Sequence, residues 1–201
     1  MRHCSFACFA LCVFAFYGCR ITQDMPEKNV LTVSPGVGVS CRFEIGMKKE
    51  DVLNSLHGEG VDCGSTIELP SCGCEIHFLP SKNGTLRCNV IKFSRRSETV
   101  KRGNDRRLKF SWSKSPSFGW KEIFNQFGVP RRVDPEKFNL LDGSFPFSFV
   151  KGGEVRVFYP AEGLCFVGVA NGAGADEIQI LKKIGQPWEE RMEEVDRNAR
   201  K

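Results

Sequence analysis

The chain has 201 residues, of which 41% are hydrophobic and 26% are charged, and its formal charge at pH 7 is +5. This composition is typical of a globular protein, and it excludes a mainly disordered, collagen-like or coiled-coil chain. Ten cysteines in this length are too few for a small protein held together by disulfides alone. The basic excess is confined to one stretch, so we expect no broad surface for nucleic acid.

Residues 1–18 have the layout of a secretory signal peptide. Arg2 forms a basic head, a run of uncharged and mostly apolar residues follows, and charge returns at Arg20. This run is shorter than the roughly 20 residues that a bilayer-spanning helix needs, which favours a cleaved leader. A soluble secreted protein and an uncleaved membrane anchor remain as alternatives.

The end of this leader resembles the lipobox of bacterial lipoproteins. Phe16-Tyr17-Gly18-Cys19 places an apolar, a variable and a small residue before a cysteine, although Leu and a small residue are usual at the first two positions. The resemblance implies that Cys19 is lipidated and becomes the mature N-terminus. Each buried methylene of the acyl chains contributes about 0.8 kcal/mol to membrane attachment. Residues 19–40 are then predicted to be a tether.

Six cysteines follow the lipidation site, and an oxidising compartment favours disulfides among them. The sequence does not fix their pairing, and buried free thiols or a metal site that includes His57 or His77 are the alternatives. Because Cys72 and Cys74 have C-x-C spacing rather than the spacing of a zinc knuckle, we expect no metal. The candidate disulfide cysteines are Cys41, Cys63, Cys72, Cys74, Cys88 and Cys165.

Three segments have apolar residues at helical spacing, and a glycine follows the last apolar residue of each. Glycine can adopt the left-handed conformation that closes a helix, so we predict three short amphipathic helices. Asp176 is expected to cap the third helix, and the charged residues 188–201 are expected to form a weakly anchored helix. The three segments are residues 45–58, 118–130 and 176–187.

Strand-like runs with hairpin turns between them follow the first two predicted helices. The run Glu154–Tyr159 alternates Val155, Val157 and Tyr159 with polar or exposed positions, which suits a sheet with one buried face. The expected solvent-side residues of the first group are Glu75, His77, Arg87 and Asn89. The six runs are residues 65–69, 74–79, 86–93, 145–150, 154–159 and 164–169.

One helix followed by a three-stranded antiparallel meander, repeated once, predicts an α+β fold of tandem repeats. Each unit alone would be a marginal domain, so two units that share an interface are expected. The predicted parts are the signal peptide 1–18, the tether 19–40, a first repeat 41–100, a second repeat 101–172, and a third helix with a charged tail 173–201.

The start of the first helix resembles a signature of two families. Ile45-Gly46-Met47-Lys48-Lys49-Glu50-Asp51-Val52 is similar to the Gly-Met motif of the BamE/SmpA outer-membrane lipoproteins and of the β-lactamase inhibitory proteins. The match covers about fifteen residues of the first repeat and is vague in the second. The resemblance implies small helices against an antiparallel sheet, in tandem copies for the inhibitors, and a non-enzymatic envelope protein whose sheet face or loops bind another protein.

A basic stretch connects the two predicted repeats and lacks apolar periodicity. We expect it to be exposed, and contact with anionic lipid headgroups is its candidate function, since each basic residue near such a surface contributes about 1 kcal/mol. The candidate lipid-contact residues are Arg95, Arg96, Lys101, Arg102, Arg106 and Arg107. His57 and His77 are expected to be surface histidines, because neither lies in a pattern typical of a catalytic triad.

The sequence thus predicts a bacterial envelope lipoprotein that faces the periplasm or the exterior. Its expected role is a non-catalytic binding or scaffolding module, with another envelope protein as partner, a lipid anchor in the membrane, and no cofactor. The alternative is a secreted or tethered inhibitor of an envelope hydrolase. A third hypothesis, an enzyme that uses cysteine chemistry, requires a reactive thiol that no local pattern indicates.

Overall fold

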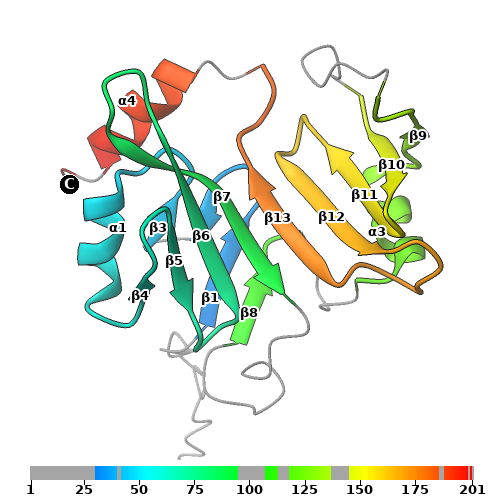
Figure 1. Ribbon diagram of the computed structural model, residues 1–201, viewed down its shortest axis with the longest axis horizontal. Helices are drawn as coiled ribbons and strands as arrows, with labels where there is room; N and C mark the ends of the chain where they lie inside the picture. The colour runs from blue at the N-terminus through cyan, green and yellow to red at the C-terminus, as the bar shows by residue number, and fades with distance from the viewer. Residues whose placement is uncertain are drawn as a thin grey trace, which may run out of the picture.

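The computed structural model describes residues 30–39, 42–94, 107–112, 118–136, 145–185, 188–198 and 200. These residues form an α+β fold with three helices and thirteen strands (Figure 1). The helices are α1 (Lys49–Leu56), α3 (Trp120–Phe127) and α4 (Trp188–Asn198). The strands are β1 (Val30–Ser34), β2 (Gly38–Val39), β3 (Phe43–Glu44), β4 (Val61–Asp62), β5 (Thr66–Leu69), β6 (Cys74–Pro80), β7 (Leu86–Ser94), β8 (Arg107–Phe110), β9 (Arg131–Arg132), β10 (Phe147–Lys151), β11 (Glu154–Tyr159), β12 (Leu164–Val169) and β13 (Glu177–Leu181).

The strands form one four-stranded and one nine-stranded sheet. The small sheet has the order β3-β2-β1-β8, and the large sheet has the order β4-β5-β6-β7-β13-β12-β11-β10-β9. Neighbouring strands are antiparallel except for two parallel pairs, β1 with β8 and β9 with β10. The large sheet therefore joins strands from both halves of the chain, with β13 at the junction.

One hydrophobic core lies between the small sheet, α1, α3 and one face of the large sheet. Phe43 of β3, Leu56 of α1, Ile91 of β7 and Phe166 of β12 belong to the same cluster of buried side chains. In Figure 1 the strands of the large sheet lie in front of β1, β8 and α3. The opposite face of the large sheet is consequently free of helices in the described part of the chain.

The first two predicted helices and all six predicted strands are confirmed, with small shifts at their ends. Val52 and Leu56 are the buried residues of α1, and Ile123 is the buried residue of α3, as the apolar spacing indicates. Gly128 ends α3 with a positive φ of 89°. At the end of α1, however, His57 itself adopts the left-handed conformation, with φ of 49°, and Gly58 follows it.

The segment predicted as the third helix is instead β13, so that prediction was wrong. Ile178 and Ile180 alternate with Glu177 and Gln179, and both isoleucines are fully buried. β13 pairs with β7 on one side and with β12 on the other, and thereby satisfies the backbone groups of two strands that would otherwise be sheet edges. Asp176 therefore caps no helix, and its N–H donates to the Val167 carbonyl at 2.8 Å.

Two segments predicted to be a tether and an exposed connection belong to the fold. The predicted tether includes β1 and β2, and the end of the basic connection forms β8, which pairs with β1. The sequence gives little warning of this, because β1 and β8 meet only through a parallel pairing of distant segments. Their residues Leu31, Val33 and Phe110 contribute to the core.

The structure also differs from the sequence prediction at Arg87 and in the charged tail. Arg87 is predicted on the solvent side of β7 but is only 6% exposed, because its guanidinium contacts the Gly46 carbonyl and Asp196 of α4. The helix predicted from the charged tail forms as α4 and is docked against the body of the protein. Its Arg191 and Val195 are each only 4% exposed.

Candidate interaction surface

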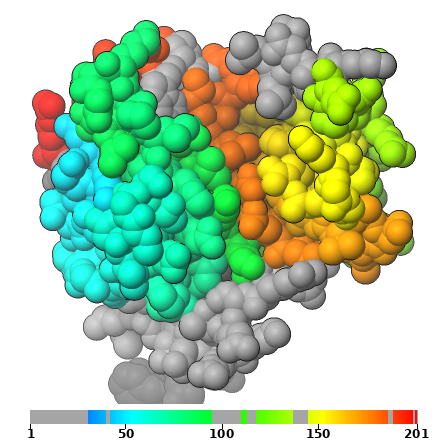
Figure 2. All heavy atoms as spheres, viewed as in Figure 1, coloured from blue at the N-terminus to red at the C-terminus, as the bar shows by residue number. Residues whose placement is uncertain are grey.

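The open face of the large sheet carries the side chains that alternate with the core. Along β11, Val157 and Tyr159 are buried in the core, so Arg156 and Phe158 point to the open face. The cross-strand register extends this face to residues of five other strands. In Figure 2 the surface of β13 lies between that of β6 and β7 on one side and that of β10 and β11 on the other.

Three phenylalanines form an aromatic patch on this face: Phe147, Phe149 and Phe158. The Phe147 and Phe158 rings stack with centroids 4.8 Å apart and an interplanar angle of 10°, and Phe149 stacks on Phe158 at 5.8 Å and 22°. Phe147 lies directly opposite Phe158 in the pairing of β10 with β11. Phe149 and Phe158 are half-buried, so part of the patch is accessible to a partner.

The aromatic patch continues into β12 as a second apolar layer. Cys165 lies opposite Phe158, and Val167 lies opposite Arg156. Phe147, Cys165 and Val167 are buried but do not belong to the main core cluster. The second half of the sheet therefore has apolar side chains on both faces. In a sheet with one solvated face, that face is typically polar.

Polar and charged side chains surround this apolar layer. Arg156 Nε donates to Glu154 Oε1 at 2.6 Å, and Gln179 Nε2 donates to Glu177 Oε1 at 2.6 Å. Lys92 of β7 lies between Gln179 and Glu75 of the neighbouring strands. An apolar centre with a polar rim is the usual composition of a protein-binding surface.

His77 lies in the first half of the same face, as expected for a surface histidine. Its Nε2 is 3.1 Å from Glu75 Oε2, and its Nδ1 is 3.4 Å from Thr66 Oγ1. A neutral ring that donates from Nε2 and accepts at Nδ1 satisfies both contacts. His57 is exposed at the end of α1. Among the described residues, Thr66 carries the hydroxyl that lies within hydrogen-bond distance of a histidine ring.

The cysteines of the described chain are free thiols. Cys63 is exposed, whereas Cys72, Cys74, Cys88 and Cys165 are buried. Burial raises the pKa of Cys88 and of Cys165, and burial together with a hydrogen bond to Cys72 raises the pKa of Cys74. Such thiols are poor nucleophiles at neutral pH.

The disulfides expected among these cysteines are absent from the described residues, and strand geometry explains one case. Cys74 lies opposite Phe93, whereas Cys88 lies opposite Phe78. Five residues of strand at about 3.4 Å each separate Phe93 from Cys88, far beyond the Cα separation that a disulfide spans. Cys165 lies in the other half of the sheet. Cys41 falls outside the described residues.

Most of the predicted membrane-contacting residues also fall outside the described residues: Cys19, Arg95, Arg96, Lys101, Arg102 and Arg106. Arg107 is the first residue of β8 and pairs with Val30, the first residue of β1. Within the described residues, no helix has the length and apolar character needed to cross a membrane. Nor does this part of the chain contain a group of three or more His, Cys, Asp or Glu side chains placed to hold a metal ion.

No known protein family, curated protein or solved structure matches this chain. The resemblance of residues 45–52 to the lipoprotein family and to the inhibitor family therefore stays a prediction.

Sequence reasoning missed the aromatic patch, although a signal was present. Phe145, Phe147 and Phe149 alternate along the predicted strand 145–150, and Phe158 follows in the next strand. Alternation alone does not say which face is the core, and in the strand 154–159 Val155 and Val157 compete with Phe158 for the core side. The pairing register decides the matter, because it places Phe147 opposite Phe158 and Ser148 opposite Val157.

Proposed function

We propose that this protein is a lipid-anchored envelope protein that binds another envelope protein through the open face of its large sheet, without catalysis of its own. The observation that carries the proposal is the aromatic patch, which lies on the face opposite the core and is surrounded by charged side chains. Aromatic side chains are enriched in the energetically important centres of protein interfaces. A contiguous apolar patch with a polar rim favours a protein partner over a small polar ligand.

The arrangement of the halves supports the tandem-repeat part of the proposal. α1 precedes the antiparallel strands β5, β6 and β7, and α3 precedes the antiparallel strands β10, β11 and β12. We interpret the two halves as repeats of one helix and a three-stranded meander. This organisation agrees with the resemblance of the first helix to the tandem β-lactamase inhibitory proteins, and it would place the binding face across both repeats.

The proposed anchor is supported by the leader and by the position of β1. Cys19 ends a lipobox-like sequence, and at most about 40 Å of extended chain connects it to Val30. Val30 is paired with Arg107, so the anchored segment and the basic segment join the fold side by side. Basic residues near an anionic membrane surface would then add to the attachment that the acyl chains provide.

Affinity capture from an envelope extract tests the binding role. The substitution Phe149→Asp places a charge in the aromatic patch, and Val129→Asp is the matched control, because Val129 is 81% exposed and lies in the loop after α3. We expect one envelope protein to be retained by the wild type and the control and lost with the Phe149 variant. Identical captured proteins for all three chains would contradict the proposal.

The identity of the captured protein separates the two forms of the hypothesis. Retention of one hydrolase, together with loss of its activity when the wild-type protein is added, would support the inhibitor alternative. Retention of a non-enzymatic envelope protein would support a scaffolding role. Both outcomes require the same Phe149-dependent binding, since both use the open face.

A further inference from the structure

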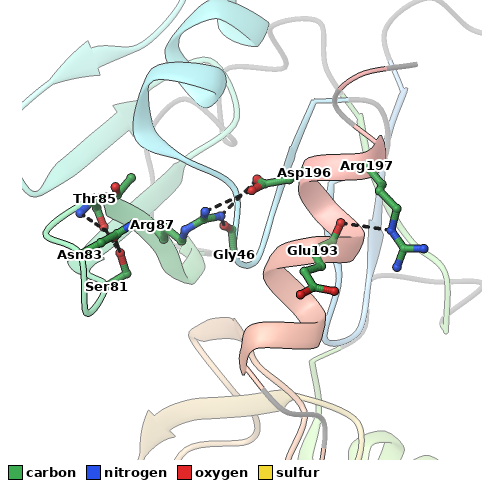
Figure 3. Close-up of polar contacts among 8 residues, drawn as sticks. All are labelled: Gly46, Ser81, Asn83, Thr85, Arg87, Glu193, Asp196 and Arg197. Carbon is green, nitrogen blue, oxygen red and sulfur yellow. Dashed lines mark hydrogen bonds and ion pairs between the residues drawn. The ribbon is translucent and has the colours of Figure 1, made fainter.

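α4 is attached to the first half of the fold by a set of reciprocal ion pairs. Arg87 of β7 donates from Nη1 and Nη2 to the two carboxylate oxygens of Asp196, each at 3.2 Å, and from Nη1 to the Gly46 carbonyl at 2.8 Å (Figure 3). Asp196 comes from α4, so one guanidinium links the helix to the loop that precedes α1. The Arg87 side chain is 8% exposed, and that of Asp196 is 26% exposed.

A second buried guanidinium lies on α4 itself and donates to acceptors on the body of the protein. Arg191 of α4 donates from Nε to the Ile45 carbonyl at 3.2 Å and from Nη2 to Glu44 Oε2 at 3.0 Å. At the start of the helix, Glu189 pairs with Lys82 at 3.3 Å on the exposed surface. The body thus offers two basic groups and one acidic group, and α4 offers the complementary two acidic groups and one basic group.

The described side chains of α4 add little apolar packing to this contact. Of the α4 side chains that the structure describes, Val195 is the buried apolar one, and it lies beside Gly46. The interactions of α4 named above all reach residues more than 100 positions earlier. The exposed Gly185, with φ of 89°, lies between β13 and the helix. An eleven-residue helix is not stable alone in water, so α4 depends on this docking.

The docked state leaves one buried donor unused. Arg87 Nε has no hydrogen-bond partner in the described part of the structure. An unsatisfied buried donor destabilises the docked state. Asp196 therefore accepts from Nη1 and Nη2 of Arg87 but not from Nε. A carboxylate from another chain could also accept from Nε.

We propose that α4 is a releasable latch: it undocks as a unit while both sheets stay folded, and its release uncovers a carboxylate-binding site centred on Arg87. Undocking would also free the carbonyls of Ile45 and Gly46 as acceptors. The site fits a charged helical segment of an incoming chain that supplies a carboxylate where Asp196 lies. This device is separate from the open face of the large sheet and does not depend on the proposed binding role.

Native-state hydrogen exchange of the full chain, resolved by residue, tests the release. We expect the α4 amides to exchange through a local opening at least about tenfold more frequent than the unfolding that exposes β13 amides. Asp196→Asn should accelerate α4 exchange about tenfold further, and β13 exchange by no more than the same factor, because both openings start from the docked state. Glu193→Gln is the matched control, because Glu193 lies on the same helix and its carboxylate has no partner among the described residues. Equal protection of α4 and β13 in the wild type would overturn the latch.

A peptide with the sequence of residues 188–198 tests the uncovered site. We expect it to bind full-length Asp196→Asn protein, whose own latch is weakened, and to bind several-fold more weakly when the peptide itself carries Asp196→Asn. Equal binding of the two peptides, or no binding of either, would overturn the assignment of Arg87 as a carboxylate site. Because neither measurement involves membranes or envelope extract, failure here is distinguishable from failure of the proposed function.

Discussion

Val30 and Arg107 lie opposite each other in the parallel pairing of β1 with β8, although more than seventy residues separate them in the sequence. The first residue of β1 therefore lies beside the first residue of β8, which directly follows the basic segment. A lipid at Cys19 and a basic segment that leaves from the same place would act on the same membrane surface, and their contributions to attachment would add.

Replacing the basic segment should weaken binding to anionic vesicles. In protein without acyl chains, changing Arg95, Arg96, Arg102 and Arg106 to Gln should lower the vesicle affinity at least about tenfold, since each basic residue contributes about 1 kcal/mol. Vesicle sedimentation at low and high salt measures this. The charge-matched control changes four exposed basic residues elsewhere: Lys121, Arg132, Lys151 and Arg197. An equal loss in the control would show that only net charge matters.

The native cysteines should differ sharply in reactivity. At neutral pH an alkylating reagent should modify Cys63 within the described part of the chain and leave Cys72, Cys74, Cys88 and Cys165 intact, because burial excludes the reagent and raises the pKa of the last three thiols. Peptide mass spectrometry after a short exposure reports each site. Rapid modification of a buried thiol would reveal an activated thiolate and would support the cysteine-enzyme hypothesis.

The Arg87–Asp196 pair should make stability depend on acid. Hydrogen bonds from Arg87 lower the pKa of Asp196 below its ordinary value of 3.8. A lowered carboxyl pKa stabilises the native state above the ordinary value, and this contribution is lost as the pH falls through the lowered value. At pH 7, Asp196→Asn should reduce the free energy of unfolding by about 1–3 kcal/mol. Urea titrations should show the two proteins converging in acid, and parallel curves would argue against the pair.

The hydroxyl of Tyr159 should stabilise the second half of the sheet. Its oxygen donates to the Gly128 carbonyl at 2.8 Å, and burial raises the pKa of Tyr159 to about 12, so the hydroxyl stays neutral at physiological pH. Tyr159→Phe keeps the ring contacts with Phe127 and Phe166 and removes the hydrogen bond. We expect a loss of about 1 kcal/mol in the free energy of unfolding. No change in urea denaturation would mean that water replaces the contact without cost.

The sequence predicts the elements whose pattern is locally unambiguous. β11 alternates cleanly between core and open face, and α3 combines helical spacing with a terminal glycine, so both are predicted correctly. β13 fails because Ile180, Leu181 and Ile184 fit a helix face, while Ile178 and Ile180 fit a strand equally well. Its two partner strands decide between these patterns, and a local reading cannot include them.

The candidate surfaces were less predictable than the fold for the same reason. Phe149 is visible as a strand residue, but only the register with β11 shows that it shares a face with Phe158. Arg87 stands at a position that alternation assigns to solvent, and the docking of α4 brings Asp196, 109 residues away, into contact with it. Both sites depend on tertiary pairing between segments that carry no matching sequence signal.

The intact mass of the protein extracted from envelope membranes tests the account most directly. A lipid-anchored binding protein should have a mass equal to residues 19–201 plus acyl groups, and a Cys19→Ala variant should lack those groups and leave the membrane fraction. A native chain that begins at Met1 without acyl groups and is recovered from the cytosol would contradict the account.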